Sequence, residues 1–205
     1  MFTGIVQGVG KIVAITDKEK LRTYRIKLPH SLTDQINIGA SIANDGCCLT
    51  VTSIISDCVT FDIMKETLTL TTLGEKKVGD LVNIERSVKY GDEIGGHVMS
   101  GHISCKAEIA GIVKSTTNCE MTLKMPFKFM KYVLYKGFIG VDGASLTVGE
   151  IDENFFKLHL IPETLSITTL NDKKVGDFVN IEIDTQTQAI VDTVERVIKE
   201  KKINN

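Results

Sequence analysis

The chain has 205 residues, of which 42% are hydrophobic and 24% charged, with a formal net charge of −2 at pH 7. This composition is ordinary for a soluble globular protein, and the absence of any basic run longer than a Lys-Lys pair argues against nucleic acid or an anionic membrane as partner. No apolar run approaches the ~18 residues of a membrane span, and the N-terminus does not resemble a signal peptide. We therefore expect a cytoplasmic protein.

Short strands dominate the first 97 residues. Residues 5–15 mix β-branched residues with two glycines and predict a strand with a bulge or sharp bend. Further strands are predicted at 21–28, 41–43, 49–54, 59–63 and 81–86, with turns at 44–46 and 78–80. Residues 65–74 predict a short helical segment. Six short strands without a long crossover helix favour a closed antiparallel barrel.

The chain is internally duplicated. Asp45-Gly-Cys-Cys-Leu-Thr-Val51 returns as Asp142-Gly-Ala-Ser-Leu-Thr-Val148, 97 residues later, and residues 39–86 match 136–183 at 22 of 48 positions without a gap. A period near 100 residues is too long for a solenoid unit and indicates two copies of one small domain. The sequence thus predicts an all-β protein with domains at 1–97 and 98–185.

A different element follows the second copy. Residues 186–205 place Ile190, Val194, Val197 and Ile198 on one helical stripe, with lysines gathered near the C-terminal end. One interpretation is a helix that folds back onto its own barrel. The other is an oligomerisation helix, because a closed barrel offers such a stripe little surface.

The five cysteines and the four histidines give no metal-site pattern. The cysteines are odd in number and include no Cys-x-x-Cys pair, so they are interpreted as reduced thiols. His97 and His102 are five residues apart, a spacing that does not place both on one face of a helix or strand. A metal pair is not expected. One of the two histidines could still contact a ligand, because the motif lies in a glycine-flanked turn at the junction of the repeats.

The two copies differ mainly in polar positions beside the shared motifs. In the alignment Cys48 corresponds to Ser145, Ser41 to Phe138, and Ile5 to His102. Cys48 could be a small core residue or a nucleophile. Two related pockets that hold one kind of molecule in two different roles would show this pattern.

These motifs, taken together, resemble riboflavin synthases of the alpha-chain type. The resemblance rests on Met-Phe-Thr-Gly-Ile-Val at 1–6, Gly-Cys-Cys-Leu-Thr-Val at 46–51, Gly-Gly-His-Val-Met-Ser-Gly-His at 95–102, and the two Glu-Thr-Leu motifs at 66–68 and 163–165. It implies two six-stranded Greek-key barrels in tandem plus a C-terminal α-helix, a homotrimer joined through that helix, and active sites shared between subunits. It also implies dismutation of 6,7-dimethyl-8-ribityllumazine to riboflavin and 5-amino-6-ribitylaminouracil, without a cofactor, and association with lumazine synthase.

The resemblance also implies site residues. The first pocket would use Gly4, Ile5, Val6, Cys48, Leu49, Thr50, Asp62, Ile63, Met64, Lys65, Glu66 and Thr67. The second would use Gly101, His102, Ile103, Lys136, Ser145, Leu146, Thr147, Leu160, Ile161, Pro162, Glu163, Thr164 and Leu165. We expect His102 to shuttle protons, Ser41 and Cys48 to assist at the acceptor ring, and Phe2 and Thr3 to form a flap over it.

Two other functions fit parts of the sequence. A non-catalytic lumazine-binding antenna protein would share the duplicated fold, but this chain keeps Thr3, His102 and both Glu-Thr-Leu motifs. A flavin reductase would need a nicotinamide-binding βαβ domain, for which the sequence has no segment.

Overall fold

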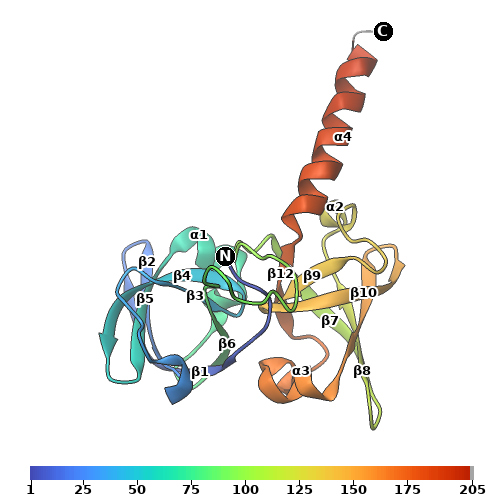
Figure 1. Ribbon diagram of the computed structural model, residues 1–205. Coiled ribbons are helices and arrows are strands. Elements are labelled where there is room, and N and C mark those ends of the chain that lie inside the picture. The colour runs from blue at the N-terminus through green and yellow to red at the C-terminus, as the bar shows by residue number, and fades with distance from the viewer. Residues whose placement is uncertain (204–205) are drawn as a thin grey trace.

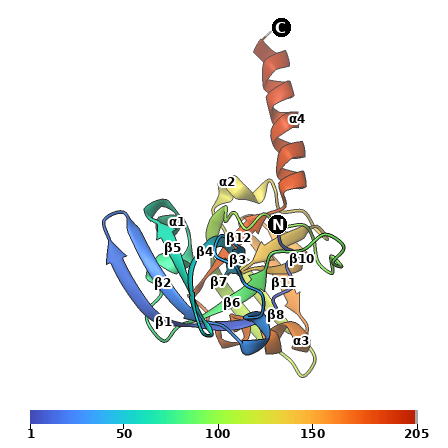
Figure 2. The same cartoon turned by 60° about the vertical axis from the view of Figure 1, so that its left-hand side comes forward.

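The structure, a computed structural model, describes residues 1–203 and consists of two barrels side by side and one projecting helix (Figures 1 and 2). The first barrel comprises β1 (Gly8–Lys18), β2 (Leu21–Lys27), β3 (Ser41–Asn44), β4 (Cys47–Ile55), β5 (Cys58–Met64) and β6 (Leu81–Arg86). The second comprises β7 (Cys105–Lys114), β8 (Cys119–Lys124), β9 (Phe138–Val141), β10 (Ala144–Asp152), β11 (Phe155–Leu160) and β12 (Phe178–Ile183).

Both barrels are closed, antiparallel and identical in topology. The first runs β1-β2-β5-β4-β3-β6, and the second has the same order in its corresponding strands. The connections from β2 to β3 and from β5 to β6 each pass over two strands, as in a Greek key. The register between β1 and β2 shifts between Ile12 and Ala14, so the predicted bulge in the first strand is present. The predicted all-β class with two six-stranded barrels and a C-terminal helix is confirmed.

Short helical turns follow the fifth strand of each barrel. They are α1 (Lys65–Leu70) with a 3₁₀ turn over Thr72–Glu75, and α3 (Pro162–Ile167) with a 3₁₀ turn over Thr169–Asp172. Thr71 and Thr168 end the first helices and accept hydrogen bonds from the Leu73 and Leu170 amides, which starts the second turns. A further 3₁₀ turn lies at His30–Leu32, and α2 (Phe127–Met130) follows β8.

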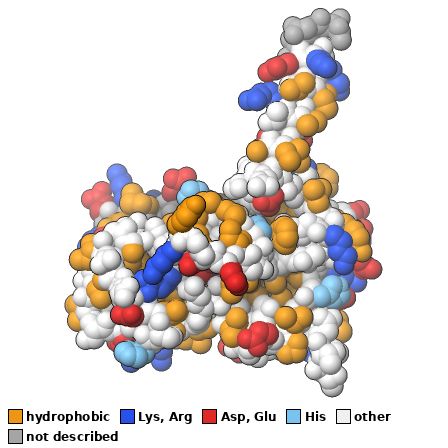
Figure 3. All heavy atoms as spheres, in the orientation of Figure 1, with side chains coloured by type: hydrophobic (Ala, Val, Ile, Leu, Met, Phe, Trp, Pro, Cys, Tyr) orange, Lys and Arg blue, Asp and Glu red, His pale blue; other side chains and the backbone are white. Residues whose placement is uncertain are grey.

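The C-terminal helix α4 (Thr185–Ile203) points away from both barrels (Figures 1 and 2). At its base, Asp192 accepts hydrogen bonds from Lys131 and Tyr132 beside α2. The predicted stripe is open: Ile190, Val194, Val197 and Ile198 are 42–65% exposed, and apolar side chains follow the helix in Figure 3. The interpretation in which this helix folds back onto its own barrel is therefore wrong.

Each barrel has its own core, and the two exchange one residue. The first core is built around Ile12, Tyr24 and Phe61, and the second around Ile109, Met121 and Phe156. Val6, from the start of the chain, packs in the second core, whereas Ile103, from the linker before β7, packs in the first. The segments that precede the two barrels therefore cross over.

The junction between the barrels repeats each contact about a local twofold axis. The Asn83 amide donates to the Asp142 carbonyl at 2.9 Å, and the Asn180 amide donates to the Asp45 carbonyl at 2.9 Å. The oxygens of the same two amides accept from the Thr169 and Thr72 backbone N–H groups. All these groups are buried, so the network satisfies atoms that would otherwise destabilise the interface.

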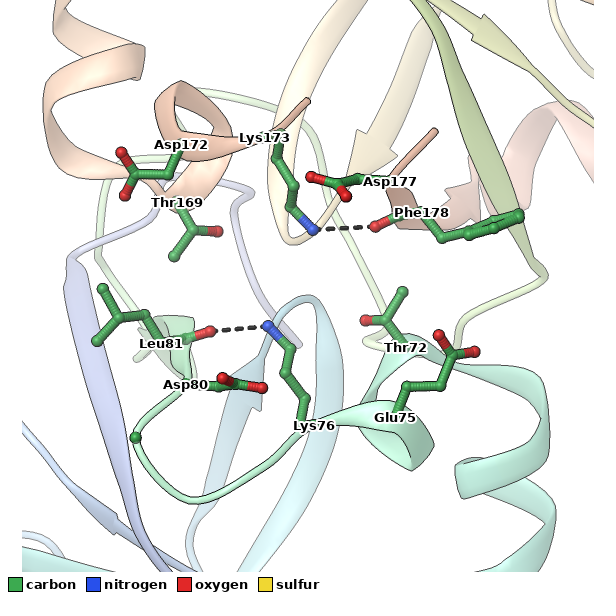
Figure 4. Close-up of a pocket in the computed structure, with 11 residues that line it drawn as sticks. Thr72, Glu75, Lys76, Asp80, Leu81, Thr169, Asp172, Lys173, Asp177 and Phe178 are labelled. Carbon is green, nitrogen blue, oxygen red and sulfur yellow. Dashed lines mark hydrogen bonds between the residues drawn. The ribbon is translucent and has the colours of Figure 1, made fainter. Parts of the chain in front are cut away.

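Two buried aspartates in the junction are neutralised by lysines from the repeated Lys-Lys-Val-Gly-Asp turns. Lys76 Nζ lies 2.8 Å from Asp45 Oδ2, and Lys173 Nζ lies 3.0 Å from Asp142 Oδ2. Both lysines line a cavity of about 550 Å³, in which they also donate to the Leu81 and Phe178 carbonyls (Figure 4). The first lysine of each turn is therefore held at the junction, because buried carboxylates require a counter-charge.

Candidate active site

A small pocket of about 180 Å³ opens beside Cys48 at the start of β4. Its walls come from both halves of the chain: Cys47, Cys48, Glu66, Thr67, Leu70 and Thr71 belong to the first barrel, and Gly101, His102 and Ile103 belong to the linker that leads to the second. The Cys48 N–H donates to the Gly101 carbonyl at 2.8 Å, which fixes the linker against β4. The pocket thus brings together Cys48 and His102, two of the predicted catalytic residues.

The second barrel has the corresponding arrangement at Ser145, near the start of β10. The Ser145 N–H donates to the Gly4 carbonyl at 2.8 Å, just as Cys48 meets Gly101. A Cβ atom on Gly4 would lie 2.5 Å from the Ser145 Cβ, and one on Gly101 would lie 2.5 Å from the Cys48 Cβ. Both glycines also have positive φ, so only glycine allows this close approach.

These contacts correct the predicted grouping of the two pockets. Residues 4–6 lie against Ser145 in the second barrel, and residues 101–103 lie against Cys48 in the first. The expectation placed each segment with the barrel that follows it in sequence, which is wrong. The physical reason is the crossover, in which Val6 and Ile103 anchor each segment in the core of the opposite barrel.

Phe2 and Thr3 do not form a flap within this chain. Phe2 is 2% exposed and packs with Ala43, Met99 and Cys48, and Thr3 is 9% exposed. The Thr3 backbone N–H and hydroxyl both donate to Glu85 Oε1, at 2.6 and 2.8 Å. The burial and these hydrogen bonds hold the two residues in the junction, where Phe2 supports the wall that carries Cys48.

His97 forms a pair with Ser145 that the sequence did not indicate. Its Nδ1 lies 2.6 Å from Ser145 Oγ, and its ring stacks on Phe138 at 5.1 Å between centroids and 16° between planes. Burial lowers the pKa of His97, opposed by the charge of Asp184. A neutral imidazole in contact with a hydroxyl can accept its proton, which activates the oxygen.

The remaining predicted residues lie at equivalent positions in the two barrels. Leu49, Ile63, Leu146 and Leu160 are buried in the cores, so they offer a ligand their backbone and not their side chains. Thr50, Asp62, Met64, Lys65, Thr147, Ile161, Pro162 and Glu163 are exposed on the same strand ends and first helical turns, with Thr164 and Leu165 half-buried. Lys136 is exposed before β9 at a φ of 64°, and Ser41 faces Thr50 across β3 and β4 outside the small pocket.

Comparison with known proteins gives the family of the chain. The Lumazine binding domain matches residues 3–87 and again 100–184. The chain is 58% identical to a riboflavin synthase of Escherichia coli K12 over 97% of its own length and 93% of the relative's, and 51% identical to one from Buchnera aphidicola (Schizaphis graminum) over 97% and 96%. The chain belongs to the riboflavin synthase family. It is an enzyme that contains two Lumazine binding domains in tandem.

Solved structures similar to this member of the riboflavin synthase family contain ligands. Crystal structures of LumP complexed with 6,7-dimethyl-8-(1'-D-ribityl) lumazine and with riboflavin match at TM-scores of 0.83 and 0.84, with 28% and 31% sequence identity. Each comparison covers 90% of this chain and 100% of LumP. The fold therefore occurs in proteins that bind lumazine and flavin rings.

Three residues near the site of this riboflavin synthase family member, His97, Glu85 and Glu182, were not predicted from the sequence alone. His97 lies outside the two aligned stretches, 39–86 and 136–183, so the repeat does not draw attention to it. Glu85 and Glu182 are identical in the two copies and stand out in the sequence only as part of the repeat. One feature of the sequence could have indicated the two glutamates: each is a charged residue within a buried strand, and unpaired charges are rarely buried.

The cysteines fall into two chemical groups. Burial raises the pKa of Cys47 and of Cys105 to about 12, which keeps both thiols protonated at neutral pH. Cys48, beside Cys47, is half-buried and lines the small pocket. Across residues 1–203, no set of three His, Cys, Asp or Glu side chains is placed to hold a metal ion, and no helix is long and apolar enough to cross a membrane.

Proposed function

We propose that the chain is a riboflavin synthase that converts two molecules of 6,7-dimethyl-8-ribityllumazine into riboflavin and 5-amino-6-ribitylaminouracil. The observation that carries the proposal is that the two repeats place unlike polar groups at equivalent positions. Cys48 and His102 line the pocket beside the first barrel, and the equivalent position in the second barrel holds Ser145, paired with His97. A reaction between two identical molecules requires such a pair, because one molecule gives a four-carbon unit and the other receives it.

The reaction balances without an added cofactor. Two C–N bonds of the donor break, its two ring carbons leave with their methyl groups, and these carbons join the two methyl carbons of the acceptor. The products contain the atoms of the two substrates, so no oxidant or reductant is needed. The 7-methyl group of a lumazine is acidic because its anion delocalises over the ring. Alignment of the two rings contributes roughly 7–11 kcal/mol and positioned proton transfer about 10²–10⁴-fold.

Roles for the polar side chains follow from their contacts. We assign His97 as the base that activates Ser145, because the two are hydrogen-bonded at 2.6 Å and burial keeps the imidazole neutral. His102, exposed at the mouth of the Cys48 pocket, is suited to shuttle protons with solvent. Cys48 and Ser41 are proposed to assist at the acceptor ring, and Ser41→Ala and Cys48→Ala variants test that role. If both variants kept near-normal turnover, these two residues would contribute only to binding.

Backbone groups and threonines are proposed to hold the ligand. In the first pocket the Thr67 hydroxyl and the residues 48–50 backbone can meet the pyrimidinedione edge, and residues 145–147 and Thr164 are equivalent in the second. Glu66, Glu163 and Lys136 are polar groups suited to the ribityl hydroxyls. These assignments give the two bound molecules equivalent contacts, because the two barrels are repeats of one domain.

We propose that the active protein is a trimer joined through α4, with each active site formed by the first barrel of one subunit and the second barrel of another. The exposed apolar stripe of α4 supports an assembly through the helix. The Cys48 pocket has a volume of only about 180 Å³, and a facing barrel would exclude water from the reacting rings. Association with lumazine synthase stays a prediction.

Absorbance spectroscopy tests the function against its rival. The metal-free protein is mixed with 6,7-dimethyl-8-ribityllumazine, and riboflavin formation is followed. Turnover without added cofactor is expected. The similarity to LumP in complex with lumazine and flavin ligands makes a non-catalytic carrier the second candidate, and tight binding with no riboflavin formed would establish it.

A further inference from the structure

Two buried carboxylates hold the crossed-over segments in place. Glu182 on β12 is 2% exposed and accepts from the Ser100 backbone N–H at 2.6 Å, from the Ser100 hydroxyl at 2.8 Å and from the Gly101 N–H at 3.1 Å. Glu85 on β6 is 3% exposed and receives the same three contacts from Thr3 and Gly4, at 2.6, 2.8 and 3.1 Å. Hydrogen bonds to an ionised carboxylate are about twice as strong as neutral ones.

Each glutamate belongs to one barrel and holds a segment that completes the pocket of the other. Glu182 is part of the second barrel, but the segment it holds presents the Gly101 carbonyl to Cys48 and places His102 at the Cys48 pocket. Glu85 is part of the first barrel, and its segment presents the Gly4 carbonyl to Ser145. In both cases two hydrogen bonds connect the carboxylate to the other barrel. One joins the carboxylate to the segment, and the other joins the segment to Cys48 or Ser145.

We infer that Glu182 is a positioning residue for the Cys48 pocket and Glu85 is a positioning residue for Ser145, each acting across the junction. This inference deepens the proposed function and rests on it for the reaction, although ligand binding tests it independently. Glu182 does not line the Cys48 pocket, and Glu85 bonds to Thr3 and Gly4 and not to Ser145. Their effect is transmitted through the Gly101 and Gly4 backbones, which have no side chain of their own to fix them.

A carboxylate is required because all three partners are donors. A glutamine at either position would keep one accepting oxygen, but its NH₂ group would face a backbone N–H that also donates. A buried donor left without an acceptor is costly, so the segment would move away from β12 or β6. Burial raises the pKa of Glu182, and the hydrogen bonds from Ser100 and Gly101 oppose this rise.

The two glutamates are matched controls for each other, because their burial and hydrogen bonds are the same and each holds a different segment. Glu182→Gln and Glu85→Gln are prepared in the full chain. Riboflavin is the probe, and its occupancy of the Cys48 pocket is read as protection of Cys48 from iodoacetamide, located by peptide mass spectrometry. We expect Glu182→Gln to lose this protection by an order of magnitude in riboflavin concentration, and Glu85→Gln, which reaches Cys48 only through the packing of Phe2, to lose clearly less.

Turnover of 6,7-dimethyl-8-ribityllumazine provides the second readout. We expect both variants to lose activity on the order of 10²-fold, the cost of misplacing a reacting group by about 1 Å. A purely structural role would lower the stability of both variants and leave Cys48 protection alike in the two. Should either variant fail to fold, Ser100→Ala and Thr3→Ala remove one contact each and are compared in the same way.

The outcomes separate the inference from the proposed function. Equal riboflavin protection of Cys48 in the wild type and in Glu182→Gln would overturn the inference, whatever the turnover. A wild type that binds riboflavin but forms none would overturn the proposed reaction, while selective loss of protection in Glu182→Gln would still establish the positioning role.

Discussion

Phe2 and Met99 pair with each other at the centre of the junction. The Phe2 N–H donates to the Met99 carbonyl at 2.8 Å, and the Met99 N–H donates to the Phe2 carbonyl at 2.9 Å. The two residues are 97 positions apart, so each pairs with its own equivalent, which places the local twofold axis between them. This bridge joins the two crossed-over segments. The segments are in turn hydrogen-bonded to Glu85 and Glu182, and they contact Ser145 and Cys48.

A close approach of two turns across this axis predicts a sharp stability effect. A Cβ on Gly46 would lie 2.7 Å from the Gly143 nitrogen, and φ at Gly46 is +79°. We expect Gly46→Ala to lower the free energy of unfolding through two costs, the positive φ and the displacement of the facing turn. The positive φ costs about 1–2 kcal/mol, and separating the turns adds a cost of the order of overpacking, about 1–3 kcal/mol. Urea denaturation measures the sum.

Gly39→Ala is the matched control for this change. Gly39 has a φ of +89°, and no atom lies within 4 Å of the position that a Cβ would occupy, so only the backbone cost applies. Equal destabilisation in the two variants would show that the contact between the Asp-Gly turns contributes nothing to stability.

The repeat shows why the fold was predictable while the grouping of the pockets was not. Strands, turns and barrel closure follow from local patterns that each copy carries in full. Asp45, Gly46 and Asn83, identical in both copies, proved to be junction residues, because a local twofold axis requires both sides to match. The crossover of residues 1–6 leaves no local signal, since Val6 and Ile103 are apolar and would suit either core.

Most of the proposed site residues were identified through family resemblance and not by chemistry visible in the sequence. The pairing of Cys48 with His102 and of Ser145 with His97 depends on contacts between residues 48 or more positions apart. Sequence periodicity describes neighbours within one element and cannot indicate such contacts. The exchange of partners between barrels had to be read from the structure.

Alkylation should distinguish the cysteines. At pH 7.5 we expect iodoacetamide to modify Cys48 before Cys47 or Cys105, because the thiolate reacts and burial, which raises the pKa of the latter two to about 12, keeps them protonated. Riboflavin should slow the reaction at Cys48, which lines the pocket. Peptide mass spectrometry after timed quenching measures the rates. A Cys48→Ser variant is the control, and rapid labelling of its Cys47 would contradict the prediction.

The α4 stripe should control assembly. We expect Val194→Asp to dissociate the oligomer and to depress turnover, because a charge in an apolar contact is strongly unfavourable and the proposed site spans subunits. Val194 is 52% exposed in the single chain. Lys199→Asp, on the opposite side of the same helix, is the matched control and should leave assembly intact. Sedimentation velocity gives the mass, and deletion of residues 187–205 should reproduce the Val194→Asp result. A monomer with full turnover would refute the shared site.

Acid should affect the Ser145 pocket through His97. Burial places the pKa of His97 below its ordinary value of 6.5, so between these two values the unfolded chain binds a proton that the folded chain does not. The stability contributed by neutral His97 is therefore complete above pH 6.5. It is lost progressively as the pH falls through that window to the folded-state pKa. Chemical denaturation across this range should show less acid destabilisation in His97→Gln than in the wild type.

Turnover provides the catalytic side of the same test. His97→Gln cannot take the Ser145 proton, so kcat should fall by about 10²–10⁴-fold, the usual contribution of a positioned general base. In the wild type the activity that depends on His97 should persist below pH 6.5, because the folded-state pKa lies lower. His30→Gln, which removes an exposed histidine outside both pockets, is the control for histidine loss. If His97→Gln kept wild-type kcat while losing only stability, His97 would be a packing partner of Phe138 and Ser145 would act without it.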